Sequence, residues 1–98
     1  RDFTINSIAL DKHLRVIDMY GGQLDLDNKV IRAVGDANER FNEDALRMMR
    51  AVRIATELGF SIQGDTLDAI KKNAPQIQKI AKHFADADRK IFVSLVLH

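Results

Sequence analysis

Residues 42–53 read Asn-Glu-Asp-Ala-Leu-Arg-Met-Met-Arg-Ala-Val-Arg, and they decide how the second half of the chain is expected to fold. The spacing predicts a helix over 43–58, because apolar residues recur every three or four positions along one face. Asn42 is the expected N-cap, and Gly59 is the expected C-terminal stop. The apolar face consists of Ala45, Met48, Met49, Val52, Ala55 and Leu58.

The opposite side of this predicted helix carries two carboxylates and two guanidiniums, from Glu43, Asp44, Arg47 and Arg50. A carboxylate accepts hydrogen bonds and a guanidinium only donates them. Asp44 beside Arg47 would therefore match a base edge that presents an amino donor next to a ring-nitrogen acceptor. Adenine and cytosine have such an edge, whereas uracil and guanine place a carbonyl oxygen where the amine would be. The same spacing is also common for an exposed ion pair on a helix, so the residues alone leave both interpretations open.

Helical patterning continues to the end of the chain. Asp65 or Thr66 is the expected cap of the next helix, and Pro75 is expected to kink or divide that helix near Asn73. A last helix is expected over 84–98. The apolar line of the middle helix is Leu67, Ile70, Ala74, Ile77 and Ile80.

The N-terminal third is mixed. Thr4 is expected to cap a short helix that runs through Leu10, and residues 24–29 are expected to form one or two helical turns. The β-branched stretches 14–18 and 30–34 predict two short strands around Gly21-Gly22, like the edge of a sheet. The expected fold class is therefore α+β and mostly α, with a hairpin-like sheet edge followed by helices.

Composition excludes several classes of protein. The chain has 98 residues, enough for one domain, and its 15 basic and 14 acidic residues give a net charge of +1. This balance excludes a generally basic nucleic-acid coat. The absence of cysteine excludes disulfides, thiol nucleophiles and cysteine-bound zinc, and it favours a cytoplasmic location. His13, His83 and His98 lack the spacing of metal ligands, and no apolar run predicts contact with a membrane.

Several motifs, taken in order, resemble one family. Residues 1–6, Arg-Asp-Phe-Thr-Ile-Asn, resemble a motif R-R-D-F-T-x-N, and residues 18–22 resemble the turn D-P-F-G-G, with Met-Tyr in place of Pro-Phe. Residues 31–35 resemble a strand that ends in V-G, and residues 40–53 resemble a segment R-F-x-E-D-x-x-R. Together they resemble the class II tRNA nucleotidyltransferases, or CCA-adding enzymes, and the related bacterial poly(A) polymerases. The resemblance covers about residues 1–80.

The resemblance implies a division of the chain and a role for each matching residue. Residues 1–36 would be the C-terminal part of a nucleotidyltransferase head domain, and residues 37–98 would be a helical neck domain that selects nucleotides. Asp44 and Arg47 would bind the base of CTP or ATP, and Glu43 would orient Arg47. The expected ribose and phosphate ligands are Arg1, Asp2, Asn6 and Arg50.

The resemblance also implies parts that this sequence lacks. The family's Mg²⁺ is held by head-domain carboxylates that precede the first motif, and the 3′ end of tRNA is gripped mainly by body and tail domains that follow the neck. The chain begins with Arg1, which suggests a piece of a longer enzyme. It is expected to hold no catalytic residue and to be inactive alone. The alternatives are a piece of a poly(A) polymerase, a non-catalytic helical RNA-binding module, or a purely structural helical domain.

Overall fold

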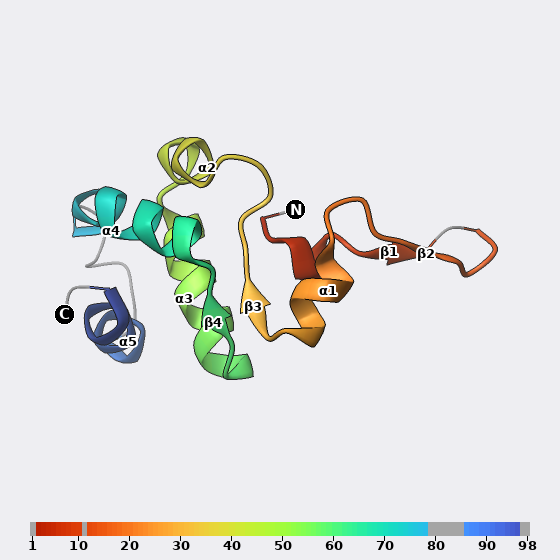
Figure 1. Ribbon diagram of the computed structural model, residues 1–98. Coiled ribbons are helices and arrows are strands. Elements are labelled where there is room, and N and C mark those ends of the chain that lie inside the picture. Colours follow the sequence, from red (N-terminus) through yellow and green to blue (C-terminus); the bar gives the residue numbers. More distant parts are fainter. Residues whose placement is uncertain (1, 11, 79–85, 97–98) are drawn as a thin grey trace.

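A computed structural model describes residues 2–10, 12–78 and 86–96 (Figure 1). Its elements are mostly helices with a few two-residue strands, which confirms the expected fold class. In chain order they are η1 (Thr4–Asn6, a 3₁₀ turn), β1 (Ala9–Leu10), β2 (Val16–Ile17), α1 (Gly22–Asp27), β3 (Val30–Ile31), α2 (Ala37–Glu43), α3 (Leu46–Leu58), β4 (Ser61–Ile62), α4 (Gly64–Gln78) and α5 (Asp86–Val96).

The helix expected from Thr4 to Leu10 is wrong beyond its first turn. Only η1 is helical, and β1 then pairs antiparallel with β2, with Ala9 opposite Ile17. The Thr4 hydroxyl does not cap η1 but donates a hydrogen bond to Asp25 Oδ2 at 2.6 Å. In Figure 1 the β1–β2 hairpin extends away from the helical part of the molecule.

The expected pairing of 14–18 with 30–34 is also wrong. β3 instead runs parallel to β4, with Val30 opposite Ser61 and Ile31 opposite Ile62. A parallel pair needs a long crossover connection, and α2 and α3 supply it. The strand at 61–62 was not predicted from the sequence, because two residues are too few to show an alternating pattern. The pairing attaches β3 to the helical part of the chain.

The single helix expected over 43–58 is in fact two elements. Asp36 caps α2 by accepting a hydrogen bond from Glu39 N at 3.1 Å, so Asn42 lies inside α2 and is not the cap. Asp44 then takes an extended conformation, with φ −153° and ψ 102°, and separates α2 from α3. Gly59 ends α3 with φ 68°, as predicted.

The cap expected for the next helix is wrong, because α4 begins at Gly64. Gln63 Oε1 accepts hydrogen bonds from Thr66 N and from the Thr66 hydroxyl, each at 2.9 Å, while Thr66 Oγ1 accepts one from Ala33 N at 3.1 Å. Pro75 lies inside α4 without dividing it. α5 confirms the last expected helix over Asp86–Val96. Ile80, residues 84–85 and residues 97–98 lie outside the described residues.

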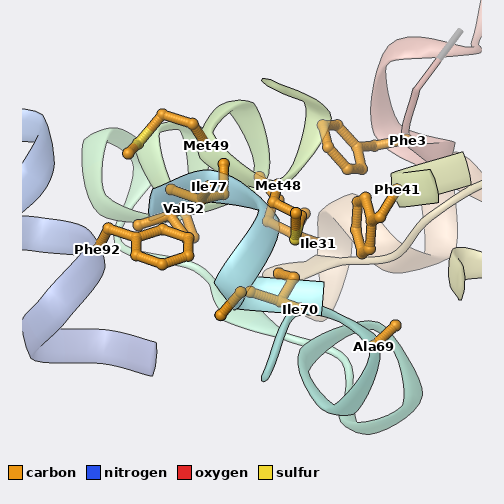
Figure 2. Packing of buried hydrophobic residues seen from close by; sticks show 13 residues of the cluster. Phe3, Ile31, Phe41, Met48, Met49, Val52, Ala69, Ile70, Ile77 and Phe92 are labelled. Carbon is orange, nitrogen blue, oxygen red and sulfur yellow. The ribbon is translucent and has the colours of Figure 1, made fainter. Parts of the chain in front are cut away.

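One hydrophobic cluster joins the N-terminal segment to the helices. Phe3 from the segment before η1 and Ile31 from β3 are buried with α3 residues such as Met48 and Val52. In Figure 2, Phe3 and Phe41 lie toward one end of this cluster and Phe92 of α5 lies toward the other. The core therefore fixes the residues around position 2 relative to the start of α3.

Candidate functional site

The backbone at Asp2 is held against the strand region that follows α1. Val34 N donates a hydrogen bond to Asp2 O at 3.1 Å, and Thr4 N donates one to Arg32 O at 3.0 Å. Between them, Phe3 forms an antiparallel bridge with Ala33, and its ring is only 1% exposed. The position of Asp2 is therefore set by sheet pairing on one side and by the hydrophobic core on the other.

Five predicted site residues form one chain of alternating charges, called here the charged cluster. Glu43 Oε2 lies 2.8 Å from Arg47 Nη1, and Arg47 Nε lies 3.3 Å from Asp2 Oδ1. Asp2 Oδ2 lies 2.7 Å from Arg50 Nε, and Arg50 Nη2 lies 3.6 Å from Asp44 Oδ2. The order is Glu43–Arg47–Asp2–Arg50–Asp44, so Asp2 stands between the two arginines.

Arg47 is the most enclosed arginine of the charged cluster, with 21% of its side chain exposed against 45% for Arg50. Its Nη1 donates to Arg40 O at 3.2 Å as well as to Glu43. The hydrogen bond with Glu43 raises the pKa of Arg47 above its usual value, and the charges of Asp2, Glu43 and Asp44 act in the same direction against the cost of desolvation. Arg47 therefore stays cationic and can only donate hydrogen bonds.

The Nε of Arg47 is buried and donates no well-aligned hydrogen bond to any described residue, although Asp2 lies close to it. Buried unsatisfied donors are rare in folded proteins and call for a specific explanation. The ion pair with Asp2 therefore supplies charge compensation here but not full hydrogen-bond satisfaction.

Asp44 lies beside Arg47, although the two do not share one continuous helix as expected. Asp44 is the extended residue between α2 and α3, and Arg47 N donates a backbone hydrogen bond to Asp44 O at 3.1 Å. The Asp44 carboxylate accepts a hydrogen bond from Leu46 N at 3.0 Å through Oδ1 and is 39% exposed. An acceptor and a donor thus stand one turn apart at the edge of the charged cluster.

Asn6, another predicted site residue, makes its hydrogen bond outside the charged cluster. Asn6 Oδ1 accepts a hydrogen bond from Phe3 N at 3.1 Å, and this bond closes η1. Arg1 lies outside the described residues. The roles given to these two residues stay predictions.

A second polar network, which sequence reasoning missed, holds α1 against η1. Asp25 is 5% exposed, and its Oδ2 accepts hydrogen bonds from the Thr4 hydroxyl at 2.6 Å and from Arg32 Nε at 3.1 Å. Asp18 accepts hydrogen bonds from Gly22 N at 2.7 Å and from Gln23 N at 2.9 Å, which fixes the first turn of α1. The Asp and Gly of residues 18–22 could have predicted this turn, because an Asp side chain often accepts hydrogen bonds from the backbone that follows it.

A cavity of about 470 Å³ is lined by the β3–α2 connection, the start of α2 and the N-terminal part of α4. Arg32, Asp36, Gln63 and Lys72 are among its lining residues, and no residue of the charged cluster is. The charged cluster is therefore not part of this cavity.

Neither a metal-binding group nor a membrane-spanning helix is present among the described residues. They contain no group of three or more His, Cys, Asp or Glu side chains placed to hold a metal ion. No helix among the described ranges combines the length and apolar character needed to cross a bilayer.

Comparison with known proteins decides the family. Residues 1–32 match the family model of the poly A polymerase head domain. The CCA-adding enzyme of Streptococcus mutans is 48% identical over 91 residues. The chain belongs to the family of tRNA nucleotidyltransferases and bacterial poly(A) polymerases. The match covers 91% of this chain and 23% of the Streptococcus mutans enzyme, so the chain spans about a quarter of that family member.

Solved structures of the family share this fold. The Bacillus stearothermophilus CCA-adding enzyme in complex with CTP matches 97% of this chain and 23% of its own, with a TM-score of 0.77 and 45% identity. A tRNA nucleotidyltransferase complexed with a primer tRNA and an incoming ATP analog matches 78% of this chain and 23% of its own, with a TM-score of 0.71 and 36% identity. The resemblance of the ordered motifs to this family is thereby confirmed.

Proposed function

We propose that this chain is the nucleotide-selecting part of a longer tRNA nucleotidyltransferase, which transfers CMP and AMP from CTP and ATP to the 3′ end of tRNA. The observation that carries the proposal is the placing of Asp44 one turn from Arg47 at the exposed edge of the charged cluster. It is supported by relatives named as CCA-adding enzymes and by a family structure solved with CTP. Their greater length supports the view that the enzyme extends beyond these residues.

In this proposal the base is selected by complementary hydrogen bonds. The Asp44 carboxylate accepts from the exocyclic amine of cytosine or adenine, and the Arg47 guanidinium donates to the adjacent ring nitrogen. Uracil and guanine would turn a carbonyl oxygen toward Asp44 and leave both acceptors unpaired, which is how polar sites reject analogues. Glu43 holds Arg47 in place through the 2.8 Å contact.

The ribose and triphosphate are assigned to the N-terminal segment and to the next turn of α3. Arg50 is 45% exposed and can donate to phosphate oxygens, and Asp2 can accept from a ribose hydroxyl. Arg1 and Asn6 complete the proposed set. In the transfer itself, the 3′ hydroxyl oxygen of the tRNA bonds to the α-phosphorus, the bond to pyrophosphate breaks, and the hydroxyl proton is released.

Mg²⁺ would stabilise the charge that develops in such a transfer. The described residues offer no group of ligands that fits this ion, so no step is assigned through it here. Its carboxylate ligands are proposed to lie in head-domain residues that precede this chain in the family. We therefore expect the 98 residues alone to transfer no nucleotide, and measurable CMP incorporation by them would contradict this expectation.

A poly(A) polymerase is the second candidate, because the family model that matches residues 1–32 describes a poly A polymerase head domain. The test is to give the complete enzyme Mg²⁺, a tRNA without its 3′ end and each nucleotide singly and together, and then to sequence the products. Two Cs followed by one A would support the main proposal. A long run of A on many RNAs would favour the second candidate, and no incorporation would contradict both.

A further inference from the structure

We infer that Asp2 is a positioning residue for base selection, acting through Arg47 and Arg50; this inference rests on the proposed function. The proposed function gives Asp2 only a contact to the ribose. The charged cluster gives it a second role, because each of its two oxygens faces the Nε of a different arginine, at 3.3 Å and 2.7 Å.

The two arginines need such a carboxylate between them. Arg47 and Arg50 are three residues apart on α3, where side chains are neighbours and like charges repel. Glu43 holds Arg47 through a hydrogen bond of 2.8 Å, and the side chain of Glu43 is 58% exposed. Asp2 is only 22% exposed and faces both guanidiniums, so it adds a shielded second contact that holds Arg47 relative to Arg50.

The restraint is effective because Asp2 itself is held in place. Its backbone carbonyl accepts a hydrogen bond from Val34 N at 3.1 Å, and the next residue, Phe3, is buried in the same cluster as Met48 of α3. The carboxylate therefore has a fixed position relative to α3, while Arg47 and Arg50 have long side chains that lose rotamer freedom when they are held. A short side chain on a fixed backbone thus sets the direction of two long ones.

A positioning role for Asp2 and a ribose contact alone have different effects on nucleotide preference. A residue that touches only the ribose affects CTP and UTP equally, because both carry the same sugar. A residue that orients Arg47 affects CTP more than UTP, because the guanidinium reads the base. The ratio of kcat/KM for CTP to kcat/KM for UTP therefore reports the positioning role and is insensitive to a uniform loss of binding.

The experiment compares Asp2→Asn, Asp2→Glu and Asp27→Asn in the complete enzyme, with single-nucleotide addition to a tRNA lacking its 3′ end. Asp27 is an exposed carboxylate on α1 outside the charged cluster and serves as the matched control. We expect Asp2→Asn to lower the CTP-to-UTP ratio about tenfold. We expect Asp2→Glu to restore part of it and Asp27→Asn to leave it unchanged. An Asp2→Asn enzyme that loses activity equally with both nucleotides would overturn the inference.

A second measurement needs no nucleotide and guards against misfolding. In the 98-residue chain, hydrogen exchange of the Arg50 Nε–H group, which faces Asp2 Oδ2 at 2.7 Å, is expected to accelerate in Asp2→Asn and not in Asp27→Asn when it is followed by NMR. Unchanged exchange in a folded variant would overturn the inference. If the unmodified enzyme fails to prefer CTP over UTP, the proposed function fails, and the role of Asp2 falls with it. If the unmodified enzyme keeps the preference and Asp2→Asn does not alter it, only the role of Asp2 fails.

Discussion

Gly22 begins α1 directly against the backbone of η1. A Cβ atom at this position would clash with Thr4 O and lie 2.9 Å from Ile8 Cγ1, so the backbone has to move to accommodate it. We expect Gly22→Ala to lower the free energy of unfolding by about 1–3 kcal/mol, as overpacking does elsewhere. Urea titration measures this difference.

Gly64 is the matched control for this change. It is the first residue of α4, and no atom lies within 4 Å of the Cβ that alanine would add. Gly64→Ala is expected to leave the free energy of unfolding unchanged or to raise it by about 0.5 kcal/mol. Equal losses from both substitutions would show that the close contact between α1 and η1 does not form.

Asp25 is the buried carboxylate that connects α1 with η1 and β3. Asp25→Ala leaves the Thr4 hydroxyl and the Arg32 guanidinium without this partner. We expect a loss of about 2 kcal/mol in the free energy of unfolding, the cost of stranding a buried donor. Asp27→Ala, on the exposed side of the same helix, is expected to change it by less than about 0.5 kcal/mol. Equal free energies of unfolding for Asp25→Ala and Asp27→Ala would argue against a buried network around Asp25.

Among the elements, α2 depends on a single cap. Asp36→Ala removes the hydrogen bond from Glu39 N and is expected to cost about 1 kcal/mol of stability, measured by urea unfolding. Asp65→Ala changes an exposed carboxylate in the first turn of α4 that was expected to be a cap. It is expected to cost less, because Gln63 holds that turn. If Asp65→Ala cost more stability than Asp36→Ala, Asp65 would be the cap of α4, as expected from the sequence.

The elements also show what the sequence could and could not predict. Gly59 was predictable, because a glycine after a periodic apolar run is a local signal for a helix end. The break at Asp44 was not, because the apolar periodicity of α3 continues into residues that precede it, and both Asn42 and Asp44 are good capping types. The pairing of β3 with β4 depends on how α2 and α3 fold back, which no local pattern records.

At the scale of the whole molecule, the hydrophobic core crosses the predicted domain boundary between residues 36 and 37. Phe3 and Ile31 pack in the same cluster as Met48 and Val52 of α3. We therefore expect Phe3→Ala to accelerate backbone hydrogen exchange in α3, because it removes a ring from the shared core. Leu14→Ala, in the exposed β1–β2 hairpin connection, should leave that exchange unchanged. If Phe3→Ala left hydrogen exchange in α3 unchanged, this would contradict a core shared by residues 1–36 and 37–98.

In the charged cluster, too, only the contacts between residues that are close in the sequence could be predicted. Glu43, Asp44, Arg47 and Arg50 could be predicted as neighbours, since they lie within one short segment of the sequence. The contact of Asp2 with both arginines could not, because it depends on the bridge between Phe3 and Ala33 and on the burial of Phe3. Charge complementarity alone does not specify which distant carboxylate occupies this place.

The most direct test of base selection by Asp44 and Arg47 is single-nucleotide incorporation by the complete enzyme carrying Arg47→Ala. We expect the preference for CTP over UTP to fall by about tenfold or more while the fold is retained, since the donor to the ring nitrogen is lost. Lys71→Ala, an exposed cation on α4, is the control and should keep the preference. A folded Arg47→Ala enzyme that still prefers CTP as strongly as before would contradict the account and leave Arg47 as a surface ion pair.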